Sequence, residues 1–309
     1  MLLSKSNNKI KTNIKNIYIS QVQYKSCGMT VVSSKKWLDF YIDKRGKNIF
    51  GMGTDMLYGS PSTNTSCKAV CLVGSSTLGI EGICGVNQAL LEESGNKINV
   101  PAIGAVCYSI NLIDKDFSHP DIKLGKFALN KRDKYLLTGE AGAGVNTRAG
   151  KMYKDWKKNM VTTGQGTFYL EKGKMKCFCI TVLNSLGVIH KDGKLLHPFK
   201  VGKKDIINID DLPRTELFDT SINAKEKPGN TTLTIFVTNV EYNQEDMKML
   251  SKKLHDVVES MVYPYGTMLD GDIFFLVSSK EIKSNENYLN DYKKVIQEAI
   301  KSPFNSREI

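Results

Sequence analysis

The sequence predicts a layered α/β sandwich, on the evidence of its apolar runs and its amphipathic segments. The apolar runs are rich in β-branched residues, and several are nearly continuous, which is typical of strands covered on both faces. The amphipathic segments supply helices that can provide this cover. Strands are expected near 17–19 and at 29–33, 69–73, 102–108, 178–183, 233–240 and 273–278.

Three helices are predicted from the spacing of apolar side chains. The best defined covers residues 244–262, where apolar residues recur every three or four positions behind Asn243, a candidate N-cap. A second covers 287–300, and a third covers 80–94 after the Gly-Ser-rich turn at 74–76. These helices complete the layers that the sandwich requires.

Composition and charge indicate a globular protein that binds neither nucleic acid nor membrane. The chain has 309 residues, of which 41% are hydrophobic and 24% charged, as in ordinary globular proteins. The net charge is +11, but the lysines spread over loops and helix faces instead of clustering with aromatic residues, so no nucleic-acid partner is predicted. There is no apolar run of about 18 residues, and the first residues lack the pattern of a signal peptide. We therefore expect a cytoplasmic protein without a membrane partner, beginning with a frayed tail.

The cysteines and histidines do not indicate a metal site. Seven cysteines without a secretory signal indicate reduced thiols. The pairs Cys67/Cys71 and Cys177/Cys179 have spacings that resemble metal-binding motifs, but both lie on predicted strands, where small thiols pack in cores. The four histidines show no ligand spacing. No metal and no cofactor are predicted.

The segment from 191 to 230 differs from the rest of the chain. It is charged, carries Pro198, Pro213 and Pro228, and has weak periodicity. We interpret it as a long surface connection, and such connections are usually functional or disordered.

This connection leads into the most unusual junction of the chain, where a loop meets a strand at Thr231. Gly229 permits backbone angles that other residues resist. If the peptide is held bent, the Thr231 hydroxyl can attack the carbonyl of Asn230. Cleavage there would free an α-amine with a pKa of ~7.7–8.0 on the residue that carries the nucleophile. The alternative is an ordinary turn followed by a strand.

A second candidate is the glycine-rich stretch 142–151, which ends in Lys151. It does not match a phosphate-binding loop, because Val145 occupies a required glycine position and Met152 follows the lysine. Thr147 also excludes the dinucleotide fingerprint. The stretch places Lys151 at the end of a tight turn, with a solvated lysine as the alternative.

Polar residues at strand ends are the remaining candidates. Asp270 and Asp272 are two positions apart, so in extended chain they point to the same side and can bind a cationic amine or exchange a proton. Asn184 follows the strand 178–183 and is a candidate oxyanion donor. Tyr108 ends another predicted strand. Each of these residues is also common in plain turns.

The order of these motifs resembles the family of L-aminopeptidase D-amidase/D-esterases and β-peptidyl aminopeptidases, which are N-terminal-nucleophile hydrolases. The resemblance covers about residues 25–280. Related aminopeptidases use a Ser nucleophile with a Ser-x-Glu pair. This chain has Thr with Asp-Gly-Asp instead, and in this respect it resembles the branch of endo-type 6-aminohexanoate-oligomer (nylon-oligomer) hydrolases. One departure is Gly266, where the family often has His. The motifs that carry the resemblance are 73–82, 100–102 with Tyr108, 142–151, 183–187, 229–232 and 269–274.

The resemblance implies a four-layer αββα sandwich, shared with ornithine acetyltransferase. It implies a single hydrolase domain over 1–309 that cleaves itself between Asn230 and Thr231 into chains 1–230 and 231–309. It further implies catalytic roles: Thr231 as the nucleophile, Lys151 as the neighbour that favours its reactive form, Asn184 and Tyr108 as carbonyl binders, and Asp270 and Asp272 as the acids that orient the Thr231 amine.

The expected function is hydrolysis of small amides, such as 6-aminohexanoate oligomers, β-peptides or amino-acid amides, by a homotetramer without cofactor or metal. Two alternatives remain at this point. One is an acyl transferase of the ornithine acetyltransferase type, distinguished by its need for an amine acceptor. The other is a non-catalytic binding protein on the same fold, favoured if processing fails. The sequence does not distinguish endo from exo cleavage.

Overall fold

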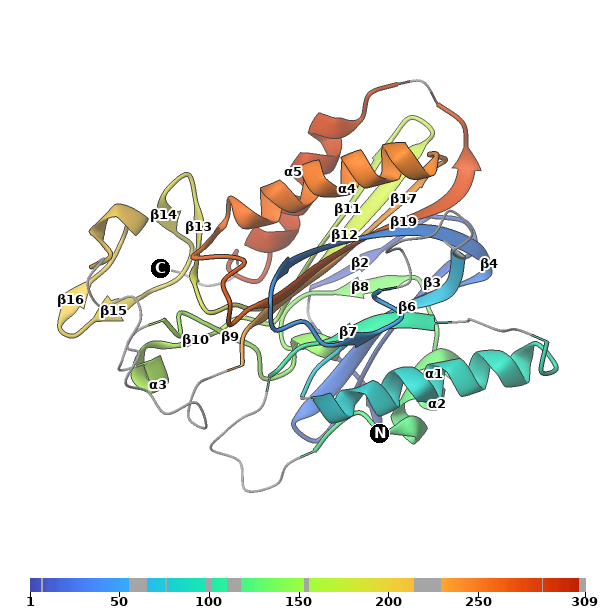
Figure 1. Ribbon diagram of the computed structural model, residues 1–309, viewed down its shortest axis with the longest axis horizontal. Helices are drawn as coiled ribbons and strands as arrows, with labels where there is room; N and C mark the ends of the chain where they lie inside the picture. The colour runs from blue at the N-terminus through green and yellow to red at the C-terminus, as the bar shows by residue number, and fades with distance from the viewer. Residues whose placement is uncertain are drawn as a thin grey trace.

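The structure is a computed structural model that describes residues 1–6, 8–55, 66–75, 77–97, 102–109, 118–152, 156–213, 229–284 and 286–305. Two helices cover each outer face, and two layers of strands lie between them (Figure 1). This arrangement confirms the predicted four-layer αββα sandwich. The helices of one outer layer are α1 (Ile80–Glu93) and α2 (Ile122–Asn130), and those of the other are α4 (Gln244–Glu259) and α5 (Leu289–Lys301).

One long strand, β4 (Cys27–Gly46), connects the two strand layers. Its first half pairs with β3 (Ile17–Tyr24) and β6 (Ser66–Val73), and its second half pairs with β19 (Gly271–Ile282). The pairing shifts register between Ser33 and Leu38, where the strand passes from one layer to the other. The strand order is β11-β12-β17-β19-β4-β6-β7-β5, in which the strands not yet given are β5 (Gly51–Met52), β7 (Ala102–Val106), β11 (Gln165–Lys172), β12 (Met175–Asn184) and β17 (Thr231–Val240).

Strand alternation divides the apolar side chains among three cores. Along β17, Leu233 and Ile235 point into the core between the strand layers, whereas Phe236 points toward α4 and α5. In β19, Phe275 lies between the layers and Phe274 faces the helices. The third core lies between β6 and the helices α1 and α2. Because the residues on both faces of these strands are apolar, the strands appear in the sequence as continuous apolar runs.

The predicted helices are confirmed with small shifts at their ends. The side chain of Asn243 accepts a hydrogen bond from the Asp246 amide at 2.8 Å, so it is the N-cap of α4. Helix α2 was not predicted. Its N-cap is Asp121, whose carboxylate accepts a hydrogen bond from the Leu124 amide at 2.7 Å. None of the helices in the described ranges is long and apolar enough to span a membrane.

Two expectations about irregular segments were wrong. The N-terminal residues are not a frayed tail, because β1 (Leu2–Leu3) pairs with β3 and β2 (Lys9–Lys11) pairs with β8 (Tyr135–Leu137). The first part of the supposed long connection, 191–213, is folded around an apolar cluster, while 214–228 lies outside the described residues. It follows β13 (Val188–Lys191) and contains the short elements β14 (Lys194–Leu195), β15 (Lys200–Val201), β16 (Lys204–Asp205) and η3 (Ile209–Asp211).

The four cysteines with metal-like spacing are buried in strands, as predicted for core thiols. Cys67 and Cys71 lie in β6, and Cys177 and Cys179 lie in β12. The remaining short elements are η1 (Thr77–Gly79), η2 (Gly142–Gly144), β9 (Arg148–Ala149), α3 (Trp156–Asn159), β10 (Val161–Thr162) and β18 (Val262–Tyr263).

Candidate active site

The candidate site lies at the start of β17, the strand that begins at Thr231. β12 pairs with β17 in antiparallel fashion and ends there, with Asn184 opposite Thr231. β19 pairs with β17 in parallel, so it starts at the same end of the sheet, and Asp270 forms a β-bridge with Asn230. The sheet therefore brings residues from three distant segments together where β12 ends and where β17 and β19 begin (Figure 1).

The peptide between Asn230 and Thr231 is held by two donors. The Thr231 hydroxyl donates to the carbonyl oxygen of Asn230 at 2.5 Å, and the Gly271 amide donates to the same oxygen at 3.1 Å. Both Asn230 and Thr231 are almost fully buried. The hydroxyl thus lies against the peptide group that it would attack, and a backbone donor polarises the carbonyl.

The carbonyl of Gly229, one peptide upstream, is bound by two side chains. Lys151 Nζ donates to it at 2.8 Å and Asn184 Nδ2 at 3.2 Å. Unusual backbone angles were the expected reason for a glycine at position 229, and this reason was wrong, since Gly229 is not among the described residues with positive φ. Instead, a Cβ at Gly229 would lie 2.0 Å from the ring of Tyr108. A glycine is required here by close approach of the ring.

Lys151 is a buried residue, which contradicts the alternative of a solvated lysine. Its side chain also donates to the carbonyl oxygen of Asn184 at 2.9 Å. Its backbone amide binds the Leu186 carbonyl at 2.7 Å, which fixes the turn after β9. Burial lowers the pKa of Lys151 to about 7, against the opposing influence of Cys107, Asp270 and Asp272.

The Asn184 side chain is oriented by contacts on both ends of its amide. Its Oδ1 accepts from the Arg148 amide at 3.1 Å, and its Nδ2 donates to the carbonyl oxygen of Tyr108 at 2.8 Å. Tyr108 follows β7 by two residues instead of ending a strand as expected. It contributes its backbone carbonyl and the face of its ring, and the residue as a whole is 37% exposed.

The two carboxylates of the Asp-Gly-Asp motif are buried and held by backbone amides. Asp270 accepts from the amide and the hydroxyl of Thr267, at 3.0 and 2.5 Å. Asp272 accepts from the Thr232 amide at 2.6 Å and from the Gly266 amide at 3.1 Å. Burial raises the pKa of both carboxyls, and the neighbouring Asp270 raises that of Asp272 further. Asp272 therefore binds the chain directly beside Thr231.

Three residues at the site were given no role from the sequence. Thr267 and Gly266 bind the carboxylates through their backbone amides. The spacing of Thr267 and Asp270, three residues apart, is typical of a turn and could have indicated this contact. Cys107 is fully buried and interacts electrostatically with Lys151 and Asp272, while burial raises the pKa of its thiol to about 12. No local pattern connects this cysteine with the site.

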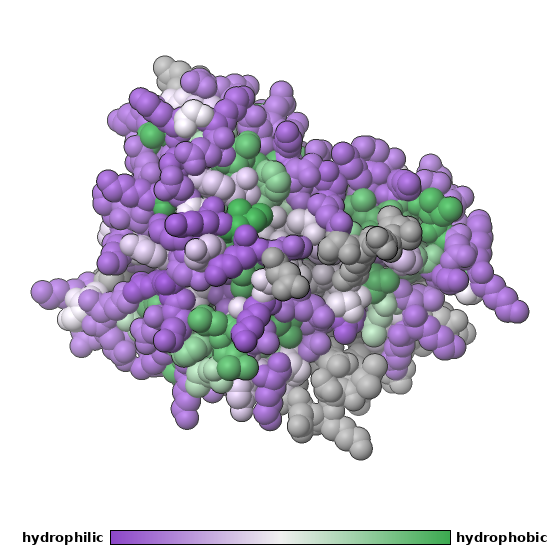
Figure 2. Space-filling view, turned by 180° about the vertical axis from the view of Figure 1, so that it is seen from behind, coloured by the Kyte–Doolittle hydropathy of each residue, from purple (hydrophilic) through white to green (hydrophobic). Residues whose placement is uncertain are grey.

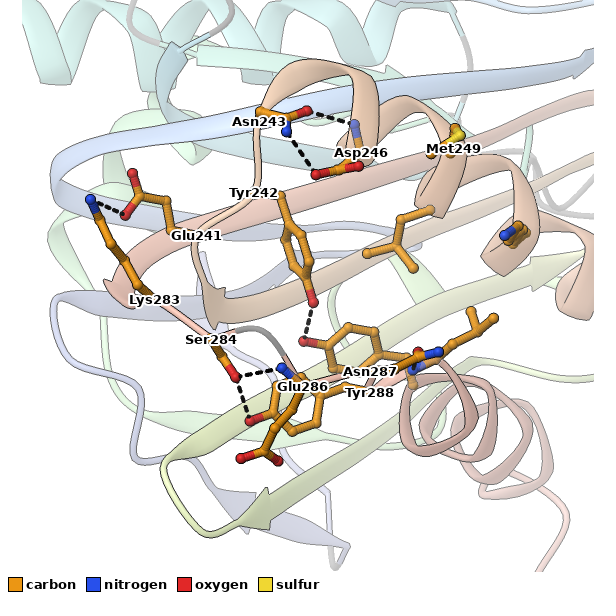
Figure 3. A pocket seen from close by; sticks show the side chains of 14 residues that line it. Glu241, Tyr242, Asn243, Asp246, Met249, Lys283, Ser284, Glu286, Asn287 and Tyr288 are labelled. Carbon is orange, nitrogen blue, oxygen red and sulfur yellow. Dashed lines mark hydrogen bonds and ion pairs between the residues drawn. The ribbon is translucent and has the colours of Figure 1, made fainter.

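A pocket of about 720 Å³ lies at the opposite end of β17 and contains none of these residues. It is lined by Glu241, Tyr242 and Tyr288 among others, and the hydroxyl of Tyr242 lies 3.0 Å from that of Tyr292 (Figure 3). At about 3.3 Å per residue, the ten residues of β17 separate it from Thr231 by roughly 30 Å. It is not part of the candidate site.

Comparison with known proteins supports the fold and finds similar curated sequences. No family model matches the chain. The chain is 29% identical over 226 residues to a 6-aminohexanoate-oligomer endohydrolase of Paenarthrobacter ureafaciens. That match covers 69% of this chain and 61% of the relative, so it spans about three fifths of the length of the curated protein.

Two solved structures have the same fold. The L-aminopeptidase D-Ala-esterase/amidase of Ochrobactrum anthropi, which represents a variant of the Ntn-hydrolase fold, superposes with a TM-score of 0.61 and 12% identity, covering 94% of this chain and 83% of that one. A Burkholderia sp. β-aminopeptidase superposes with a TM-score of 0.61 and 9% identity, covering 97% of this chain and 88% of that one. The sandwich is therefore the fold of these Ntn-hydrolase aminopeptidases.

Proposed function

We propose that the chain is a self-processing amide hydrolase whose nucleophile is Thr231. The observation that carries the proposal is the buried junction, in which the Thr231 hydroxyl contacts the carbonyl of Asn230 at 2.5 Å while the Gly271 amide binds the same oxygen. Similarity to an oligomer endohydrolase supports the same chemistry. Residues 1–230 and 231–309 would be the two products of one hydrolase domain.

Self-cleavage proceeds by an N-to-O acyl shift. The Thr231 oxygen attacks the carbonyl carbon of Asn230, and the peptide C–N bond breaks while an ester C–O bond forms. The hydroxyl proton passes to the departing nitrogen, which becomes the α-amine of Thr231. Water then hydrolyses the ester, leaving a carboxyl group on Asn230 and a free hydroxyl on Thr231. Gly271 donates the hydrogen bond that stabilises the oxyanion.

The processed site repeats this chemistry on an external amide. The amine of Thr231 accepts the proton of its own hydroxyl as the oxygen attacks, and the leaving amine receives that proton. Lys151 and Asn184 bind the carbonyl oxygen of the external amide, as they bind the carbonyl oxygen of Gly229 in the uncleaved chain. Asp270 and Asp272 hold the adjacent backbone and stabilise the ammonium form of Thr231. Tyr108 borders the position of the acyl carbon.

The contact between Tyr108 and Gly229 predicts the substrate class. If a substrate carbonyl replaces that of Gly229, the carbon beside it takes the place of the Gly229 Cα, where the Tyr108 ring leaves no room for a Cβ. Amides with a CH₂ next to the carbonyl, such as 6-aminohexanoate oligomers and β-amino-acid amides, fit this position. α-Substituted amino-acid amides fit it less well.

The decisive experiment is intact-mass analysis of the purified protein with matched variants. Wild type is expected to give fragments that end at Asn230 and start at Thr231, and Thr231→Ala is expected to stay a single chain. Thr234→Ala is the control, because Thr234 lies in the same strand and its hydroxyl binds Thr181 instead of the junction. A wild type that remains uncleaved after long incubation would contradict the proposal.

Turnover is then measured on a panel that pairs unbranched with branched acyl groups. Glycine amide is compared with alanine amide, and linear 6-aminohexanoate oligomers with α-peptides, each with and without a free amine acceptor. We expect hydrolysis of the unbranched members without need of the acceptor. Product that forms only when the acceptor is present would instead favour acyl transfer.

A further inference from the structure

A chain of polar groups, with the fully buried His255 at its centre, leads from ion pairs at the surface to the loop that holds the two carboxylates. It consists of Arg45 and Asp43 on β4, His255 on α4, and Tyr265 in the loop before β19. None of these residues belongs to the proposed catalytic set. His255 is fully buried, so its contacts are made entirely within the protein.

The hydrogen bonds of this chain have one consistent direction. His255 Nδ1 lies 2.7 Å from Asp43 Oδ2, and His255 Nε2 lies 2.6 Å from the Tyr265 hydroxyl. Burial lowers the pKa of His255 and raises that of Tyr265, so both are neutral. An ionised carboxylate only accepts, so Nδ1 carries the proton and Nε2 accepts from the tyrosine hydroxyl.

Asp43 is kept ionised by its partners. Although burial opposes it, the contacts with His255 and Arg45 hold the pKa of Asp43 below its ordinary value. The guanidinium of Arg45 lies 3.4 Å from Asp43 and 2.6 Å from Asp256, and it also pairs with Glu259. The chain therefore starts from a network of charged groups that holds β4 against α4.

The chain runs alongside the start of β19. In the pairing of β4 with β19, Asp43 is opposite Phe274 and Arg45 is opposite Asp272. The His255 ring stacks on Phe274, with ring centroids 5.5 Å apart. The imidazole is therefore fixed both by its hydrogen bonds and by an aromatic neighbour two residues after Asp272.

Tyr265 is the last member of the chain, and the next two residues bind the carboxylates. The Gly266 amide donates to Asp272 at 3.1 Å, and the Thr267 amide donates to Asp270 at 3.0 Å. Gly266 has a positive φ of 64°, so the loop depends on a fixed backbone at this point. Anchoring the Tyr265 hydroxyl fixes where these two amides point.

We propose that Tyr265, His255 and Asp43 are positioning residues that hold the 265–267 loop so that its amides orient both carboxylates. The proposal deepens the proposed function and rests on it for its catalytic consequence. The orientation of the loop itself can be tested without activity. A hydrogen bond to the ionised form of a carboxyl lowers its pKa, so a loosened loop raises the pKa values of Asp270 and Asp272.

The test compares Tyr265→Phe with Tyr292→Phe. The Tyr292 hydroxyl also makes hydrogen bonds, a buried one to Thr238 at 2.9 Å and a partly buried one to Tyr242 at 3.0 Å, but it lies at the other end of β17. We expect Tyr265→Phe to speed hydrogen–deuterium exchange of the Gly266 and Thr267 amides about tenfold, as for the loss of one hydrogen bond. Tyr292→Phe is expected to leave that exchange unchanged. Asp43→Asn is the second variant and should act like Tyr265→Phe.

The kinetic readout uses the same variants. In Tyr265→Phe, kcat should fall about tenfold with KM unchanged, and the acid limb of the pH–kcat profile should move to higher pH. Unchanged amide exchange in both Tyr265→Phe and Asp43→Asn, or equal kinetics in Tyr265→Phe and Tyr292→Phe, would overturn the proposal. A wild type without processing or turnover would reject the proposed function, while the exchange comparison would still decide the positioning role.

Discussion

At the scale of single residues, the buried amine of Lys151 has the clearest physical consequence. Burial lowers its pKa to about 7 in the folded protein, whereas an unfolded chain has a lysine pKa of about 10.4. Between these values the unfolded state binds a proton that the folded state does not. This lysine therefore makes the free energy of unfolding rise with pH over that range.

We predict that Lys151→Met removes this contribution. With Thr231→Ala as the background, to prevent cleavage, the free energy of unfolding should rise less steeply between pH 7.5 and 9.5, by up to about 1.4 kcal/mol per pH unit. Denaturant titrations across that pH range measure the slope. Lys174→Met, which alters an exposed lysine, is the control. Equal slopes for Lys151→Met and its background would mean that the amine keeps an ordinary pKa.

The contact between Gly229 and Tyr108 gives a second prediction. A Cβ at position 229 would meet the Tyr108 ring at 2.0 Å, so Gly229→Ala must displace either the ring or the junction. We expect Gly229→Ala to slow self-cleavage at least tenfold, and the double variant with Tyr108→Ala to recover much of the rate. Time courses of fragment formation on denaturing gels measure this. Processing of Gly229→Ala at the wild-type rate would contradict the close packing.

At the scale of elements, the position of β17 decides what cleavage does to the fold. β17 lies inside the sheet, paired with β12 on one side and β19 on the other. The fragment 231–309 would contain β17, β19, α4 and α5, while β12 and β4 belong to the other fragment. Eight residue pairs join β17 to β12, and eight join β19 to β4.

We therefore predict that the two fragments remain associated after cleavage. They should elute together in native size-exclusion chromatography and separate only in denaturant, because separation would expose the pairing edges of both strands and two apolar cores. The uncleaved Thr231→Ala variant provides the reference elution volume. Elution of the small fragment by itself in native buffer would contradict this prediction.

At the scale of the whole molecule, the surface bears on assembly. Figure 2 shows one face on which hydrophilic residues predominate and hydrophobic residues gather in separate patches. Such patches often mark contacts between protein chains. Large apolar side chains that are exposed include Trp37, Phe50, Ile207, Met249 and Met268.

We predict a homotetramer. Light scattering should give a mass about four times that of the 34.5 kDa chain, for wild type and for Thr231→Ala alike. The measurement should be repeated at high salt, since a net charge of +11 opposes association at low ionic strength. A mass equal to one chain at micromolar concentration in both buffers would rule out the tetramer.

The elements whose residue pattern is local could be predicted from the sequence. Continuous apolar runs such as 233–240 and 273–278 predicted strands covered on both faces, and the periodicity after Asn243 predicted α4. The second half of β4 and the whole of β11 were missed, because their polar and charged residues do not form an apolar run. The resemblance of motif order supplied the four-layer arrangement and the catalytic roles of the candidate residues.

How the candidate residues are held depends on contacts between distant parts of the chain. Lys151 is buried because the Gly229 and Asn184 carbonyls accept its hydrogen bonds, and Gly229 is a glycine because of the Tyr108 ring. His255 and Asp43 are more than 200 residues apart in sequence and meet across β4 and α4. Burial, pKa and close approach depend on which side chains the fold places together. No local pattern encodes that information, whereas strand and helix periodicity is set by the residues of each element.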